Sequence, residues 1–191
     1  QWEEYTDNPL EELKKQLPDT QFIYIDAYSK QGFSSEMLWP KWYEEWQKEV
    51  AQADLVIFFC GAMESEDTEQ FDRNSARINP NQSYMINQSI RMGKKTVVVL
   101  QSGGALILDE WEESADAIVY MGLAGESAGG AIADILSGKV NPSGKLPFTL
   151  PYKYEDHPAV RYGEYQAENC KYNEDIYVGY RYFETIPGEK E

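Results

Sequence analysis

The sequence predicts an α/β fold, in which helices flank both faces of a mostly parallel, doubly wound sheet. Two segments, 54–60 and 95–100, are apolar at nearly every successive position. Such runs are typical of strands that are covered on both faces. Segments with helical spacing of apolar residues lie between the predicted strands. This alternation indicates an α/β sandwich rather than an all-helical or all-strand domain.

Each element has a local signal. Asn8 and Pro9 predict the start of a first helix, because Asn is a favoured cap and Pro is favoured in the first turn. Gly138 predicts the end of the last helix of the series, since Gly commonly follows a helix. The remaining elements are expected in alternation: a strand over 21–26, a helix over 41–52, a strand over 54–60, a helix over 80–92, strands over 95–100 and 116–121, and a helix over 126–137.

The C-terminal quarter differs in composition from the rest of the chain. From residue 141 onward prolines recur and tyrosines are dense. We expect residues 141–191 to form an extended, Tyr- and Pro-rich loop layer that belongs to the same domain and offers a surface to a partner. The whole chain, 1–191, is then a single α/β sandwich domain.

Composition excludes several functional classes. The formal net charge is −16, and such an excess of negative charge disfavours binding to nucleic acids or anionic membranes. No apolar run approaches the roughly 20 residues of a membrane span. Two cysteines, Cys60 and Cys170, make neither a disulfide framework nor a metal cluster, which favours a cytoplasmic over a secreted location. Because the chain lacks an initiator Met, we expect a fragment or a processed form.

The motif GESAG over 125–129 matches the G-x-S-x-G nucleophile elbow of serine esterases. That interpretation makes Ser127 the nucleophile and His157, the single histidine, the base, with Asp156 or Glu155 as the orienting acid. An acid adjacent in sequence to the histidine reaches the ring poorly, and no HGGG-type oxyanion segment precedes the motif. We therefore favour a strand-to-helix packing turn.

Cofactor and metal sites are not predicted. GKVNPSGK over 138–145 has one residue too many for a Walker A loop, and Leu146 stands where Ser or Thr is required. Histidines and cysteines are not clustered as metal ligands. The acidic segment 64–72 lacks the glycine that an EF-hand loop needs at its turn.

The segment 61–73, which follows the apolar strand 54–60, is rich in carboxylates. Ligands of open parallel sheets gather beyond the carboxyl ends of the strands, where this segment lies. Retaining glycoside hydrolysis needs two carboxyl groups, and a carboxylate loop near aromatic residues suits that chemistry. A solvated acidic turn explains the same composition equally simply. The candidate residues are Glu64, Glu66, Asp67, Glu69, Asp72 and Arg73.

Six segments follow one another in an order that matches known motifs. NPLEELK over 8–14 resembles NPLEGLK, ADLVI over 53–57 resembles ADVVI, and EQFDR over 69–73 resembles E-G-x-D-R. Further along, GKKTVVVLQSGG over 93–104 resembles GKxVVVVLNSGGP, GESAGGAIADILSGKVNPSGKL over 125–146 resembles PGQEAGNAIADVLFGKVNPSGKLP, and DIYVGYRYF over 175–183 resembles EGIFVGYRYFD. The match covers nearly the whole chain, and its longest part contains NPSGKLPFT. By these motifs the chain resembles the C-terminal α/β sandwich domain of family 3 glycoside hydrolases, the β-glucosidase and β-xylosidase type.

The resemblance implies a role in hydrolysing β-glucosides or related β-glycosides. By its E-G-x-D-R motif, Glu69 would be the general acid/base of an active site shared with a (β/α)₈ barrel of the same protein. Glu66 and Glu64 are the alternative positions, because Gln70 stands where the family has Gly. Asp72 and Arg73 would fix the loop by an ion pair or contact the sugar. Ser127 falls where the family has Glu, and this position is not a nucleophile there.

The resemblance also implies that this chain is part of a larger enzyme. The barrel that carries the nucleophile in the family is absent from the sequence. We therefore expect the chain alone to be inactive on glycosides. We expect no metal or cofactor to take part. The alternative is a domain of the same fold that binds carbohydrate or acts as a scaffold without catalysis. The sugar and linkage are set largely by barrel residues.

Overall fold

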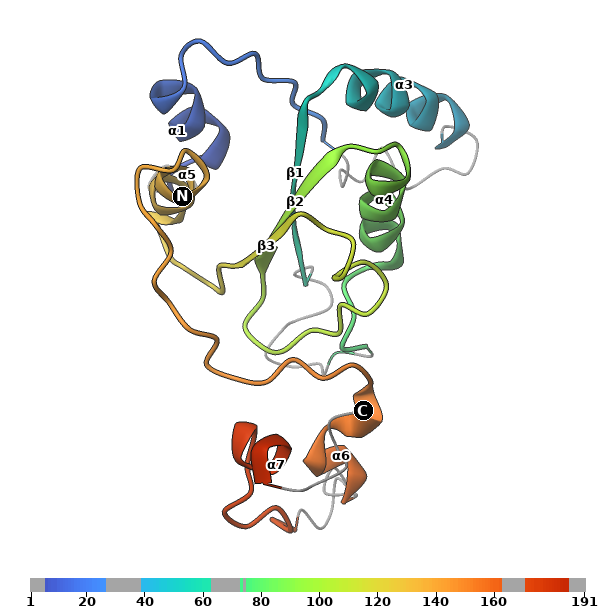
Figure 1. Cartoon of the computed structure of the whole chain (residues 1–191), viewed down its shortest axis with the longest axis vertical. Coiled ribbons are helices and arrows are strands. Elements are labelled where there is room, and N and C mark those ends of the chain that lie inside the picture. The colour runs from blue at the N-terminus through green and yellow to red at the C-terminus, as the bar shows by residue number, and fades with distance from the viewer. Residues whose placement is uncertain (1–5, 27–38, 63–72, 74, 163–170, 186–191) are drawn as a thin grey trace.

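A three-stranded parallel sheet forms the centre of the molecule (Figure 1). The computed structural model describes residues 6–26, 39–62, 73, 75–162 and 171–185. The strands are β1 (Leu55–Gly61), β2 (Lys95–Gln101) and β3 (Ala117–Tyr120), in the order β1-β2-β3. Leu55 pairs with Lys95 in β2, and Val97 of β2 pairs with Ala117 in β3.

Helices cover both faces of this sheet, which confirms the predicted α/β fold (Figure 1). On one side lie α1 (Pro9–Gln16) and α5 (Ala128–Leu136), and on the other lie α3 (Trp39–Gln52) and α4 (Pro80–Arg91). Among the described residues, no helix has the length and apolarity needed to cross a bilayer.

The hydrophobic core follows from strand alternation. Successive side chains of a strand point to opposite faces, so Val98 and Leu100 of β2 join Phe58 and Cys60 of β1 in one cluster with residues of α3 and α4. Val99 points to the other face, where α5 contributes buried residues. The buried set on the α3 and α4 side includes Trp46, Val50, Met85, Ile86, Leu106, Leu108 and Trp111.

Helices α1 and α5 pack closely because of one glycine. A Cβ at Gly129 would run into the backbone carbonyl of Asp7, so only Gly fits at this crossing. The Asp7 N–H donates to the carbonyl of Glu126 at 2.9 Å. Gln16 of α1 donates to Asp134 of α5 at 2.7 Å. Asn8 caps α1 as predicted, with its Oδ1 accepting from the Leu10 N–H at 2.9 Å.

The predicted strand over 21–26 was wrong. This segment passes beside β1 but carries no strand assignment, and it makes no ladder with a described strand. Its sequence QFIYID has the alternation of a strand. A strand is defined by hydrogen bonds to a neighbour, however, and β1 is not paired to it.

The C-terminal region is more helical than expected. Residues 141–152 have no helix or strand, as predicted, but a 3₁₀ turn, η2 (Tyr154–Asp156), and two short helices, α6 (Pro158–Arg161) and α7 (Tyr180–Thr185), follow. Tyr182 of α7 is buried and meets the ring of Tyr162 edge-on, with ring centroids 6.2 Å apart. The tyrosine-rich segment therefore has a small aromatic contact of its own.

Candidate functional site

The carboxyl ends of β1 and β2 lie side by side and form the base of the candidate site. Gly61, the last residue of β1, pairs with Gln101, the last residue of β2. A Cβ at Gly61 would overlap the carbonyl oxygen of Gln101, so the strands can approach this closely only with Gly here. The Gly61 N–H donates to the buried amide oxygen of Gln82 at 3.3 Å, which ties the end of β1 to α4.

The turn after β2 is held by side chains from two strands. The buried hydroxyl of Ser102 donates to the Gly104 carbonyl at 3.0 Å. Tyr120 at the end of β3 places its hydroxyl 2.7 Å from both the Ser102 and the Gly104 carbonyl oxygens. Phe148 packs edge-on against the Tyr120 ring, with centroids 5.2 Å apart. Turn 102–104 is thus fixed from two directions.

Arg73 lies against this turn. A Cβ at Gly104 would come within 3.1 Å of Nη2 of Arg73, so the glycine leaves room for the guanidinium. Its Nη1 is buried and makes no hydrogen bond with the described part of the chain. Arginine keeps its charge in proteins, and a buried guanidinium therefore calls for an acceptor. A cavity of about 200 Å³ adjoins it, lined by Arg73, Ala76, Ala105, Pro151, Tyr154, His157 and Val160.

The chain beyond Arg73 is fastened to the segment that follows β2. The Ile107 N–H donates to the Ala76 carbonyl at 2.9 Å, and Arg77 and Ile107 form an isolated parallel bridge. The Arg77 guanidinium makes a two-pronged ion pair with Asp109, and its second contact measures 2.8 Å. This guanidinium holds the pKa of Asp109 below its usual range. Both ends of segment 62–73 are therefore anchored at the same sheet edge.

The structure describes only part of the predicted site. Glu69, Glu66, Glu64 and Asp72 lie outside the described residues, and their predicted roles stay predictions. Arg73 lies inside them, at the position given above. Among the described residues, no group of three or more His, Cys, Asp or Glu side chains could hold a metal ion.

The residues of the esterase interpretation lie on different elements. Ser127 is exposed and stands at the N-cap of α5, where its side chain makes no capping bond. His157 precedes α6 and lines the cavity beside Arg73. Helices α5 and α6 lie at well-separated places in the molecule (Figure 1). The GESAG motif thus forms a strand-to-helix turn, in which Gly125 has a positive φ and Gly129 allows α1 to pack on α5.

Three residues of this edge were not singled out from the sequence: Ser102, Gly104 and Tyr120. The pattern SGG after a buried strand signals a tight turn at a carboxyl end. That signal marks 102–104 as a candidate loop. The SGG pattern contains no indication that Arg73, about thirty residues earlier, fills the space left by Gly104.

The chain is similar to a known protein family. Residues 1–180 match the model of the glycosyl hydrolase family 3 C-terminal domain. The chain belongs to glycosyl hydrolase family 3. The segment 62–73 and the turn 102–104 both lie within the matched range.

Relatives and solved structures support this membership. The chain is 36% identical over 141 residues to probable beta-glucosidase I of Aspergillus flavus, covering 73% of this chain and 16% of that protein. It is 31% identical over 182 residues to thermostable beta-glucosidase B of Acetivibrio thermocellus, covering 94% of this chain and 23% of that protein. The crystal structure of a Kluyveromyces marxianus beta-glucosidase in complex with glucose has a TM-score of 0.69 at 32% identity, over 76% of this chain and 17% of that one. The chain thus spans less than a quarter of these relatives' length.

Proposed function

We propose that this domain supplies the general acid/base of a retaining β-glycosidase whose active site it shares with a (β/α)₈ barrel. The observation that carries the proposal is the family 3 match over residues 1–180, within which EQFDR over 69–73 resembles the family's E-G-x-D-R pattern and follows the carboxyl end of β1. The relatives named above are beta-glucosidases, so β-glucosides or related β-glycosides are the proposed substrates.

Glu69 is the proposed acid/base, with Glu66 and Glu64 as alternatives. In the first step its carboxyl proton passes to the glycosidic oxygen as the barrel's carboxylate attacks the anomeric carbon and the aglycone leaves. In the second step the Glu69 carboxylate takes a proton from water, and the resulting hydroxyl displaces the barrel's carboxylate from the sugar. The proton lost in the first step is recovered in the second.

The geometry at the two ends of the loop supports this role. An acid/base group must be held within a fraction of an ångström of its working position. Gly61 is fixed to Gln82 at one end, and Arg77 is fixed to Asp109 at the other. Eleven residues lie between Gly61 and Arg73, and the chain on either side of them is held by these contacts.

Arg73 is proposed as a positioning residue for this loop. Its buried Nη1 needs an acceptor, and the carboxylate of Asp72 is the proposed partner. An ion pair here would couple the loop's last turn to Gly104 and to the cavity under η2. A direct contact between Arg73 and the sugar is the alternative role.

Replacing the acid/base is the decisive experiment. In the intact protein that contains this domain, Glu69→Gln should lower kcat on an alkyl or unactivated aryl β-glucoside by about two to four orders of magnitude. On a substrate with a good leaving group, such as dinitrophenyl β-glucoside, the rate of the first step should fall much less, because this leaving group departs with little or no protonation. Added azide should then raise turnover and yield a β-glycosyl azide. The exposed Glu44 of α3 provides a matched control, Glu44→Gln, which should retain normal kcat.

Other outcomes separate the alternatives. Unchanged kcat in Glu69→Gln, with loss and azide rescue in Glu66→Gln or Glu64→Gln, moves the role along the loop. Unchanged kcat in all three variants indicates a scaffold or a carbohydrate-binding domain. Covalent labelling of Ser127 by a fluorophosphonate, absent in Ser127→Ala, would instead establish an esterase. The 191-residue chain alone should not turn over nitrophenyl glucoside or xyloside.

A further inference from the structure

The hydroxyl of Tyr120 links the third strand of the sheet to the turn against which Arg73 lies. Tyr120 is the last residue of β3 and pairs with Leu100 of β2. This register brings its side chain to the turn that follows β2, where its hydroxyl lies 2.7 Å from the carbonyl oxygens of both Ser102 and Gly104. A tyrosine hydroxyl has one proton to donate, so this single group serves two acceptors of the same turn.

The two carbonyl oxygens of the turn converge on that hydroxyl. Without the donor they would face each other unpaired, which is unfavourable for part-buried acceptors, and the turn would change shape to find other donors. The side chain of Ser102 cannot replace Tyr120, because its own hydroxyl already donates to the Gly104 carbonyl at 3.0 Å. The shape of turn 102–104 therefore depends on a side chain that lies 18 residues after Ser102.

The turn in turn determines where the Arg73 guanidinium lies. Its Nη2 would be only 3.1 Å from a Cβ at Gly104, so the guanidinium rests directly on the turn. The cavity of about 200 Å³ adjoins the same side chain, and Tyr154 and His157 of the C-terminal region line it. A side chain beside an open space is not held by close packing there. The contact with the turn therefore has a larger share in placing Arg73.

The hydrogen bonds of the turn also limit which acceptor Arg73 can use. The Gly104 carbonyl accepts from both Ser102 and Tyr120, and it does not bind the buried Nη1 of Arg73. A buried guanidinium needs an acceptor and would compete for a carbonyl that lost its donor. Because the Gly104 carbonyl is occupied, Arg73 stays available for a carboxylate of the loop that precedes it.

The position of Arg73 passes to Glu69 through a short piece of chain. Glu69 precedes Arg73 by four residues. Four residues span at most about 14 Å when fully extended, so a displacement at Arg73 is not absorbed by a long flexible segment. A misplacement of about 1 Å in a catalytic group can cost about a hundredfold in rate. A small change in turn 102–104 is therefore expected to have a measurable effect on an acid/base at Glu69.

We propose that Tyr120 is a positioning residue for the acid/base of this domain. Its hydroxyl fixes turn 102–104, the turn fixes Arg73, and Arg73 fixes the loop that carries Glu69. This inference rests on the proposed function. Tyr120 exchanges no proton with the substrate, so loss of its hydroxyl should weaken general acid catalysis and leave a step that needs no acid nearly unchanged.

Tyr120→Phe tests the proposal, because it removes the hydroxyl and keeps the ring that packs edge-on against Phe148. In the intact protein that contains this domain, kcat/KM on methyl β-glucoside should fall about tenfold, as expected for a displaced acid. On dinitrophenyl β-glucoside kcat/KM should fall by less than about twofold, since this leaving group needs little protonation. Tyr43→Phe is the matched control. It removes a hydroxyl that donates to Gln88 at 3.0 Å between α3 and α4, and it should leave both values unchanged.

A double mutant distinguishes positioning of the acid/base from a general loss of structure. In Glu69→Gln the acid is already absent, so adding Tyr120→Phe should lower kcat/KM on methyl β-glucoside no further. If azide rescue places the acid/base at Glu66 or Glu64, the corresponding Gln variant takes the place of Glu69→Gln. A residue that only supports the fold would lower kcat/KM in both backgrounds.

Three results would overturn the proposal. The first is an equal fall on the two substrates in Tyr120→Phe, and the second is an unchanged kcat/KM on methyl β-glucoside. The third is a further tenfold fall in the double mutant. Each of these leaves the proposed function intact as long as Glu69→Gln alone shows selective loss and azide rescue. If no Glu variant of the loop loses activity, the proposed function fails, and this inference fails with it.

A second variant covers the case in which Tyr120→Phe does not fold. Ser102→Ala removes the other hydroxyl that donates to the Gly104 carbonyl. It should show the same selectivity, with a larger fall on methyl β-glucoside than on dinitrophenyl β-glucoside. An equal fall on both substrates, or no fall on either, would then refute the proposal.

Discussion

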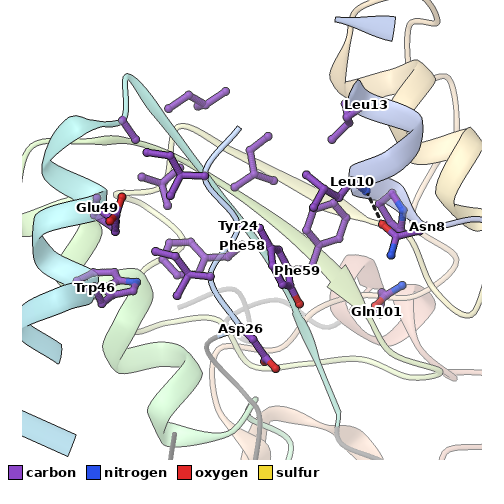
Figure 2. A pocket seen from close by; sticks show the side chains of 18 residues that line it. Asn8, Leu10, Leu13, Tyr24, Asp26, Trp46, Glu49, Phe58, Phe59 and Gln101 are labelled. Atoms are coloured by element: carbon purple, nitrogen blue, oxygen red, sulfur yellow. Dashed lines mark hydrogen bonds between the residues drawn. The ribbon is translucent and has the colours of Figure 1, made fainter. Parts of the chain in front are cut away.

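β1 and β2 are adjacent strands of seven residues each, both apolar and both parallel, yet their surroundings differ. Val98, Val99 and Leu100 of β2 are completely buried, with partners on both edges and helices on both faces. In β1 only Phe58, Cys60 and Gly61 are buried, and its outer edge borders an open cavity of about 480 Å³ that is lined by α1, α3, β1 and residues 23–26 (Figure 2). Similar apolar sequences therefore acquire different burial from their neighbours alone.

The comparison also separates two kinds of edge. The carboxyl edge, where both strands end, is fixed by hydrogen bonds that Ser102 and Tyr120 donate and that Gln82 accepts. The lateral edge of β1 has apolar walls and no such network among the described residues. We infer that the carboxyl edge is built to position a loop, whereas the lateral edge of β1 is not fixed in this way.

The largest expected effect tests the burial difference directly. Val98→Asp in β2 places a carboxylate in a fully buried site and should destabilise the chain by about 4 kcal/mol or more, enough to unfold it. Leu55→Asp in β1 should cost only about 0.5–1 kcal/mol, because Leu55 is half-exposed. Urea unfolding followed by circular dichroism measures both. Equal losses would contradict the asymmetry.

Next in size is the close contact of the two carboxyl ends. Gly61→Ala should lower the free energy of unfolding by about 2–3 kcal/mol, because the added Cβ meets the Gln101 carbonyl, which cannot move without breaking the strand pairing. Gly144→Ala is the matched control, since a Cβ there has no neighbour within 4 Å. Thermal unfolding compares the two. In the intact enzyme Gly61→Ala should also lower kcat. A neutral result would mean that the strand ends are not held as described.

A smaller effect concerns the buried thiol near that end. Burial raises the pKa of Cys60 to about 12, so the folded chain keeps this thiol protonated at neutral pH. Its contribution to stability is complete below the unfolded-state pKa of about 8.5 and is lost as pH rises toward 12. Iodoacetamide at pH 8 should leave Cys60 unmodified in the folded chain and modify it in urea, as peptide mass spectrometry would show. Cys60→Ala should flatten the alkaline fall in stability. Rapid modification of folded Cys60 would show that β1 opens readily.

The smallest effect is at the anchor after the loop. Asp109→Asn should cost about 0.5 kcal/mol at pH 7, because the Arg77–Asp109 pair is about one third exposed. The pKa of Asp109 is lowered, so the pair's contribution is present above its ordinary value of about 3.9 and is lost as pH falls below it. Urea midpoints of the variant and the parent chain should therefore converge near pH 2. Asp19→Asn, at an exposed position, serves as control. A constant difference at all pH values would exclude the ion pair as its cause.

Local signals predicted most of the elements. The first turn of α1 could be predicted because Asn8 caps the helix from within the same turn. β1 and β2 could be predicted because runs of apolar residues with β propensity need no distant information. Segment 21–26 could not, since its alternation fits a strand but a strand exists only when a neighbour pairs with it. The contact of Arg73 with Gly104 could not be predicted either, because it joins residues distant in sequence.

The sequence by itself determined the class of fold, the family and the order of helices and strands, because capping, periodicity and motif spacing act within a few residues. The tertiary structure alone decided that β2 is enclosed while β1 borders an open cavity, and that Arg73 lies against the turn 102–104, which Tyr120 holds. These facts depend on which backbone groups find partners across the sheet. Pairing of that kind joins segments far apart in the chain, and local sequence does not encode which edge stays free.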